Sequence, residues 1–120
     1  MKNILLITSK KNLNTLNYKN ILSYLKKIKL PHEVIDTELE DFSNLNTNKQ
    51  TLIVSLGGDG TALKAMKIAW LKDLDVLPIG SGRVGYLVSS IKSFNSVIDK
   101  WKINKSQKVS RKAIIQNKNH

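Results

Sequence analysis

The order of apolar and polar positions along the chain predicts strands that alternate with helices. Short apolar runs indicate buried strands, and an apolar residue at every third or fourth position indicates a helix. The predicted strands are Lys2–Thr8, His32–Asp36, Thr51–Leu56, Val76–Ile79 and Val109–Ile115. Two helices are predicted over Asn14–Lys29, which Pro31 stops, and over Thr61–Lys72. A last helix is predicted to be capped by Ser89 or Ser90. It carries five apolar residues on one face: Ile91, Phe94, Val97, Ile98 and Trp101. Residues Glu38–Lys49 predict a loop or a short helix.

Strands that are apolar throughout are typical of a parallel sheet with helices on both faces, so we expect an α/β fold. The length of 120 residues fits one domain. No apolar run approaches the roughly 20 residues that a membrane span needs, and no signal peptide is visible. The sequence contains no cysteine for a disulfide or a thiolate metal site. We therefore expect a cytoplasmic protein without a membrane partner.

The chain is strongly basic, with 20 Lys and Arg against 9 Asp and Glu. From Lys100 onward there are seven basic residues and no acidic one. Such a balance can attract nucleic acid or nucleotide phosphates. Because aromatic residues are not interleaved with the basic ones, a solvated Lys- and Asn-rich surface is the favoured interpretation and a nucleic-acid partner is not expected.

A first glycine-rich segment, Gly57-Gly58-Asp59-Gly60-Thr61, follows the strand Thr51–Leu56 and opens a helix. Ligands of open α/β sheets bind at the carboxyl ends of the strands, and glycine amides at a helix start can seat phosphate oxygens. The spacing is not that of the ATPase P-loop. A carboxylate at Asp59 can hold Mg²⁺ or accept a proton from an attacking hydroxyl. The alternative is an ordinary strand-to-helix turn with Asp59 as the helix N-cap.

A second glycine-rich segment, from Gly80 to Leu87, follows the next predicted strand and is expected at the same edge of the sheet. Arg83 can pair with a phosphate, and Tyr86 can stack on a base. An equally weighted alternative is a glycine-rich turn with Tyr86 packed in the core.

Two stretches of the chain, LIVSLGGDGTALKAMK and LPIGSGRVGYL, resemble the NAD kinases. That family carries a GGDGT motif and then a segment that ends in Gly-Arg-Leu-Gly-Phe-Leu. Lipid kinases of the diacylglycerol type share GGDGT, and phosphofructokinases carry a related form. Lipid kinases usually place Asn-Glu shortly after the motif, where this chain has Leu63-Lys64. They also favour Gly-Asn-Asp in the second segment, where this chain has Gly82-Arg83. Both differences favour the NAD kinases.

The resemblance implies a three-layer, Rossmann-like parallel sheet of the NAD kinase and diacylglycerol kinase type. It implies transfer of a phosphoryl group from ATP, or from polyphosphate, to the 2′-hydroxyl of the adenosine of NAD, with Mg²⁺ or another divalent cation. Asp59 is then the catalytic base, and no residue is assigned as a metal ligand. The implied phosphate- and nucleotide-binding residues are Gly57, Gly58, Gly60, Thr61, Gly82, Arg83, Gly85, Tyr86 and Leu87.

The chain also departs from the family. Gly80 stands where the family usually has Asn, and Val84 and Tyr86 replace Leu and Phe. NAD kinases are longer and have a β-rich second domain with an Asn-Glu motif. We therefore expect residues 1–105 to form the α/β domain and residues 106–120 to begin a β-rich domain. A poorly active or inactive nucleotide-binding fragment, and a lipid or sugar kinase, remain alternatives, and association into a homo-oligomer is left open.

Overall fold

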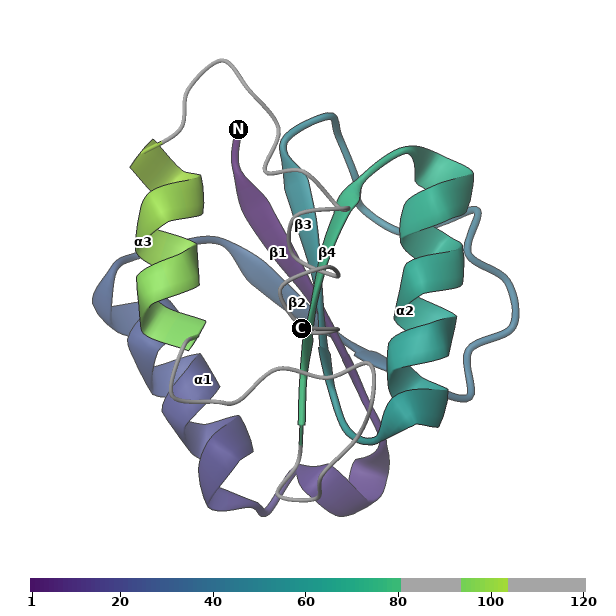
Figure 1. Ribbon diagram of the computed structural model, residues 1–120, viewed down its shortest axis with the longest axis horizontal. Helices are drawn as coiled ribbons and strands as arrows, with labels where there is room; N and C mark the ends of the chain where they lie inside the picture. The colour runs from purple at the N-terminus through teal and green to yellow at the C-terminus, as the bar shows by residue number, and fades with distance from the viewer. Residues whose placement is uncertain (81–93, 104–120) are drawn as a thin grey trace, which may run out of the picture.

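The computed structural model describes residues 1–80 and 94–103. Within these residues, four parallel strands form one sheet in the order β2-β1-β3-β4. Helices α1 and α3 cover one face of this sheet, and α2 covers the other (Figure 1). The elements are β1 (Asn3–Thr8), the short 3₁₀ helix η1 (Lys10–Asn12), α1 (Leu16–Lys27), β2 (His32–Asp36), β3 (Thr51–Leu56), α2 (Asp59–Lys72), β4 (Asp75–Ile79) and α3 (Phe94–Ile103). The predicted three-layer α/β fold is confirmed.

The two central strands, β1 and β3, are buried at every position. Successive side chains of a strand point to opposite faces, so both faces of the sheet must be covered to bury them all. Ile4 and Leu6 pack in the core shared with α1 and α3, whereas Leu5 and Ile7 pack in the core under α2. The unbroken apolar runs in the sequence therefore reflect two separate cores on either side of one sheet.

Helix α3 lies beside α1 and buries the face that the sequence predicts, with Phe94, Ile98 and Trp101 in the core. The ring of Phe94 meets the ring of Tyr24 edge to face, with centroids 6.2 Å apart. The hydroxyl of Tyr24 donates a hydrogen bond to Asp99, and this bond raises the pKa of Tyr24. Ser89, Ser90, Ile91 and the predicted strand Val109–Ile115 lie outside the described residues.

The N-terminal segment is tied to the C-terminal end of α3 through Lys2. The Nζ atom of Lys2 donates to the backbone oxygens of Trp101 and Lys102 at 2.5 and 2.8 Å. It also lies 5.2 Å from the centre of the Trp101 ring. A cation satisfies the carbonyl groups at the negative end of a helix, so Lys2 helps to hold α3 against the sheet.

The four predicted strands that lie in the described residues are confirmed to within one residue at each end, but three helix boundaries differ. Helix α1 starts at Leu16 rather than Asn14, because Thr15 caps it by accepting a hydrogen bond from the amide of Tyr18. It ends at Lys27, because Lys29 adopts a left-handed conformation with φ 58° before Pro31 is reached. Helix α2 starts two residues before Thr61, at Asp59.

Candidate functional site

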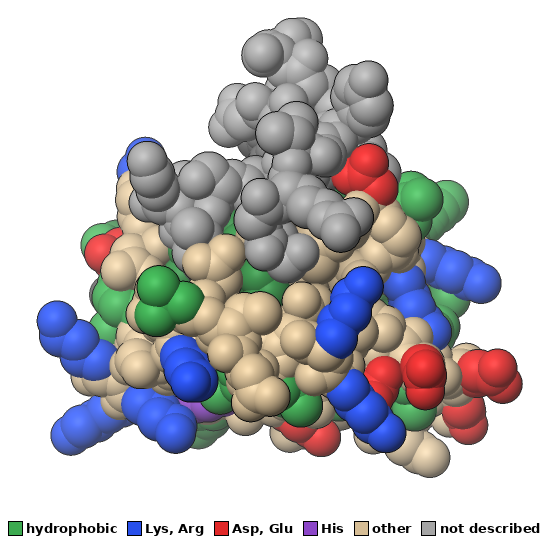
Figure 2. Space-filling view, turned by 90° about the horizontal axis from the view of Figure 1, so that it is seen from below, with side chains coloured by type: hydrophobic (Ala, Val, Ile, Leu, Met, Phe, Trp, Pro, Cys, Tyr) green, Lys and Arg blue, Asp and Glu red, His purple; other side chains and the backbone are tan. Residues whose placement is uncertain are grey.

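The carboxyl ends of the strands meet at one edge of the sheet, at the bottom of Figure 1 and facing the viewer in Figure 2. Leu56 at the end of β3 is aligned with Thr8 of β1 and with Ile79 of β4. The amide of Gly57 donates to the carbonyl of Ile79 at 3.0 Å and so extends this pairing by one residue. Gly57 and Gly80 therefore start from the same edge, as the sequence predicts.

Only the first glycine-rich segment is described beyond its opening residue. The second segment is described only at Gly80. The candidate residues that lie outside the described residues are Gly82, Arg83, Gly85, Tyr86 and Leu87. The placement of these five residues stays a prediction.

Gly58, not Asp59, is the N-cap of α2, so the interpretation of Asp59 as an N-cap is wrong. Gly58 has an extended backbone, with φ −86° and ψ −164°, and its carbonyl accepts the first helical bond from Ala62 at 3.1 Å. Asp59 and Gly60 belong to the first turn of the helix rather than to the loop. A carboxylate is stabilised there by the positive end of the helix, which explains why the helix extends back to Asp59.

Gly57 is a glycine for a structural reason. A Cβ atom at this position would lie 2.6 Å from Oγ1 and 2.9 Å from Cβ of Thr61. Thr61 is β-branched and stands in the first turn of α2, so its side chain has little freedom to move away. The side chain of Thr61 thus occupies the space that a side chain at position 57 would need.

No steric reason of this kind requires glycine at positions 58 and 60. A Cβ atom added to either would meet nothing within 4 Å, and both residues are exposed. Glycine in a helix costs up to about 1 kcal/mol relative to alanine, so the fold alone would favour a side chain at position 60. Two bare backbone positions at the positive end of α2 suit a ligand that approaches the main chain closely, as a phosphate group does.

Replacing Gly60 by alanine should separate stability from binding. We expect Gly60→Ala to leave the free energy of unfolding unchanged or raise it by up to about 1 kcal/mol, while weakening the binding of phosphate ligands. Gly57→Ala is the matched control and should lower that free energy by about 1–3 kcal/mol through the contact with Thr61. Urea unfolding and calorimetric titration with inorganic tripolyphosphate measure both effects. Wild-type affinity in Gly60→Ala would exclude this loop as a phosphate seat.

The turn after β1 also belongs to this edge, which the sequence analysis did not recognise. The buried side chain of Asn12 donates through Nδ2 to Oγ1 of Thr8, Oγ of Ser9 and the carbonyl of Leu56, at 3.1, 3.2 and 3.2 Å. Thr8 donates to the same carbonyl of Leu56 at 2.7 Å. The available signal was the pair Thr8-Ser9 at the end of an apolar strand, followed closely by Asn12. These bonds hold the turn against the residue that precedes Gly57.

Two further properties of the described part of the chain bear on its chemistry. Residues 1–80 and 94–103 contain no group of three or more His, Cys, Asp or Glu side chains that could hold a metal ion. In the same residues, no helix has both the length and the apolar character needed to cross a membrane.

A parallel three-layer sheet with a glycine turn at the start of α2 is an arrangement in which open α/β domains commonly bind nucleotides. Comparison with known proteins makes the assignment specific, because the sequence profile of the ATP-NAD kinase N-terminal domain matches residues 1–102. The chain therefore belongs to the NAD kinase family.

Curated relatives named NAD kinase agree with this assignment. The one from Caldicellulosiruptor saccharolyticus is 36% identical over 73 residues, which cover 61% of this chain and 28% of the relative. The one from Fusobacterium nucleatum is 37% identical over 70 residues, which cover 58% of this chain and 23% of the relative. The chain thus spans about a quarter of the length of these relatives.

Proposed function

We propose that this chain is the nucleotide-handling domain of an NAD kinase that phosphorylates NAD to NADP with ATP. The observation that carries the proposal is the pair of exposed, unobstructed glycines around Asp59 at the start of α2, in a chain of this family. The positive end of α2 and its backbone amides suit phosphate groups, and Asp59 supplies a carboxylate at the same place.

Asp59 is the proposed general base. The 2′-hydroxyl of the adenosine of NAD attacks the γ-phosphorus of ATP and transfers its proton to the carboxylate of Asp59. The new bond joins the ribose oxygen to phosphorus, and the bond between phosphorus and the β–γ bridging oxygen breaks, releasing ADP. Asp59 is half-buried in the first turn of α2, so its position is set by the helix rather than by a loose loop. A fixed position favours proton transfer in the transition state.

A divalent cation such as Mg²⁺ fits the described residues only as a companion of the phosphate donor. Mg²⁺ at phosphoryl-transfer sites commonly takes phosphate oxygens and water, with one or two carboxylates from the protein. Asp59 is the carboxylate that the described residues offer at the glycine turn. When bound, the cation would neutralise phosphate charge. The remaining contacts to ATP and NAD are proposed for Gly57, Gly58, Gly60 and Thr61 and, in the second segment, for Gly82, Arg83, Gly85, Tyr86 and Leu87.

The experiment that tests the proposal is an assay of NADP formation by the intact protein with NAD and either ATP or polyphosphate. Diacylglycerol and fructose 6-phosphate serve as competing acceptors, because lipid and sugar kinases share the motif. We expect NADP to form and neither competing acceptor to be phosphorylated. Phosphorylation of lipid or sugar without NADP would overturn the proposal. A cytoplasmic location, where NAD and ATP are available, is proposed with this function.

A further inference from the structure

Two adjacent lysines form the turn that follows β1. Lys10 and Lys11 are both exposed and, with Asn12, make up η1. The carbonyl of Lys10 accepts a hydrogen bond from the amide of Leu13 at 3.2 Å, but within the described part of the chain neither lysine side chain has a hydrogen bond or an ion pair with another residue. The resemblance to the NAD kinases assigned no role to this turn. Two neighbouring cations repel each other, so their side-by-side placement needs a compensating contact or free exposure to water.

The turn is fixed against β3, the strand that leads into the glycine segment. The two side chains that bracket the lysines, Thr8 and Asn12, both donate to the carbonyl of Leu56. Thr8 and Leu56 are partners in the sheet, and neighbouring strands lie about 4.8 Å apart. The lysine turn is therefore tied to the residue that directly precedes Gly57, two positions before the N-cap of α2.

Within the described residues, the side chains of Lys10 and Lys11 form no ion pair with the acidic groups at this edge, Asp36, Glu38 and Asp59. Asp36 ends β2 and is aligned with Thr8, and Glu38 lies two residues further on; β2 lies on the opposite side of β1 from β3. The carboxylate of Asp36 accepts a hydrogen bond from the amide of Glu38 at 2.8 Å, and this bond stabilises the turn that follows β2. In Figure 2, which looks onto this edge, Lys side chains are spread over the face, whereas most acidic side chains gather at one side.

We propose that Lys10 and Lys11 contact the phosphate chain of the phosphate donor, a nucleoside triphosphate or an inorganic polyphosphate, and that Asn12 is the positioning residue of this contact. The inference rests on the proposed function, because it takes the glycine turn as the seat of the phosphates. Lysine is a flexible point charge that suits phosphate oxygens without fixed geometry. A triphosphate carries more negative charge than the pyrophosphate of NAD, so the same two cations attract it more strongly.

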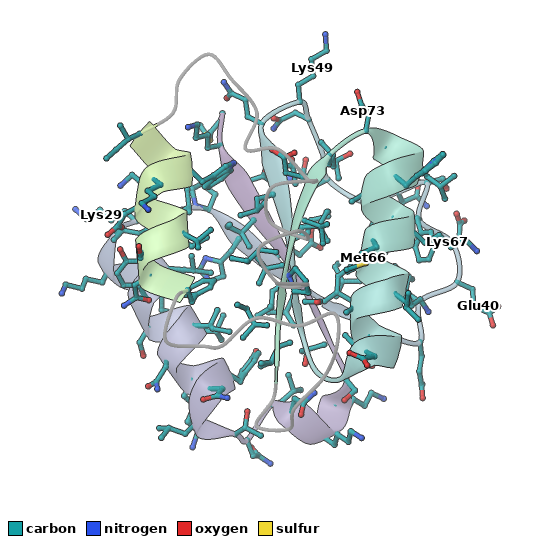
Figure 3. All side chains as sticks on the ribbon, viewed as in Figure 1. Lys29, Glu40, Lys49, Met66, Lys67 and Asp73 are labelled. Atoms are coloured by element: carbon teal, nitrogen blue, oxygen red, sulfur yellow. The ribbon has the colours of Figure 1, made fainter. Side chains whose placement is uncertain are left out.

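The test compares two variants that each lose two positive charges. Lys10→Gln with Lys11→Gln removes the turn cations. Lys26→Gln with Lys49→Gln removes exposed cations at the far end of the molecule, in the last turn of α1 and before β3, where Figure 3 labels Lys49. We expect the first variant to bind ATP and inorganic tripolyphosphate about 10-fold more weakly at low salt, and the control to change less than about 2-fold. NAD affinity should be unchanged in both.

Asn12→Ala tests the positioning role by keeping both lysines and releasing the turn. In the NADP assay we expect this variant to raise KM for ATP several-fold and to leave KM for NAD near its wild-type value. Its effect should be largely absent when Lys10 and Lys11 are already replaced, because the same contact is lost only once. Effects that simply add would show that Asn12 serves stability alone.

The outcomes separate the inference from the proposed function. If the lysine variant binds ATP and tripolyphosphate as the control variant does, the inference is wrong, while a loss of binding in Gly60→Ala still supports the phosphate seat. If the lysine variant loses NAD affinity instead, the turn contacts the acceptor and the assignment to the donor is wrong. If the wild-type protein binds neither ATP nor tripolyphosphate, both the inference and the proposed function fail.

Discussion

Replacing Asp59 by asparagine is expected to lower the turnover number for NADP formation by about 10²–10⁴-fold, the usual contribution of a general base. The amide keeps the shape of the carboxylate but cannot take the proton of the 2′-hydroxyl. The loss of a negative charge from the first turn of α2 should lower the free energy of unfolding by only about 0.3–1 kcal/mol. Steady-state kinetics of the intact protein and urea unfolding measure the two quantities.

Asp73→Asn is the matched control for this prediction. Asp73 lies at the opposite end of α2, away from the carboxyl edge of the sheet, as Figure 3 shows. Its backbone is left-handed, with φ 55°, a conformation that asparagine tolerates. Turnover should therefore stay close to the wild-type value. Near-normal turnover in Asp59→Asn would remove Asp59 from the base role, and recovery of turnover at high Mg²⁺ concentration would make it a cation contact instead.

Replacing Phe94 by alanine is expected to give the largest loss of stability. Phe94 is only 1% exposed and is among the largest fully buried side chains of the described residues. It stands at the start of α3 and packs in the core shared by α1, α3 and the sheet. Removing a buried phenyl ring costs about 3–5 kcal/mol, a large part of the 5–15 kcal/mol that a domain usually has. The midpoint of urea unfolding should fall accordingly.

Asn95→Ala provides the control, because Asn95 is the next residue of the same helix and is exposed. Its effect should stay within about 0.5 kcal/mol. Phe94→Leu should lie between the two, since leucine refills part of the space but cannot meet the edge of Tyr24. A loss below about 1 kcal/mol in Phe94→Ala would show that α3 is not held to the sheet through this ring.

The sequence by itself determined the strands and helices of the described residues, and it marked the glycine segment as the candidate site. A strand such as Thr51–Leu56 is recognisable because every position must be apolar or small when both faces of the sheet are covered. The segment from Gly57 to Thr61 is recognisable because three glycines within four residues directly follow such a strand. Burial of Phe94, Ile98 and Trp101 followed from their helical spacing.

Only the tertiary structure decided how these parts serve one another. The strand order placed β1 beside β3, and this pairing alone brought the lysine turn and Asn12 to the glycine segment. Only the position of the Thr61 side chain shows that packing requires a glycine at position 57 and does not require one at position 60. These contacts join residues that packing brings together and that no regular spacing along the chain connects. For this reason the sequence showed Asn12 only as an ordinary turn residue, because the carbonyl of Leu56 to which it donates lies 44 positions further along the chain.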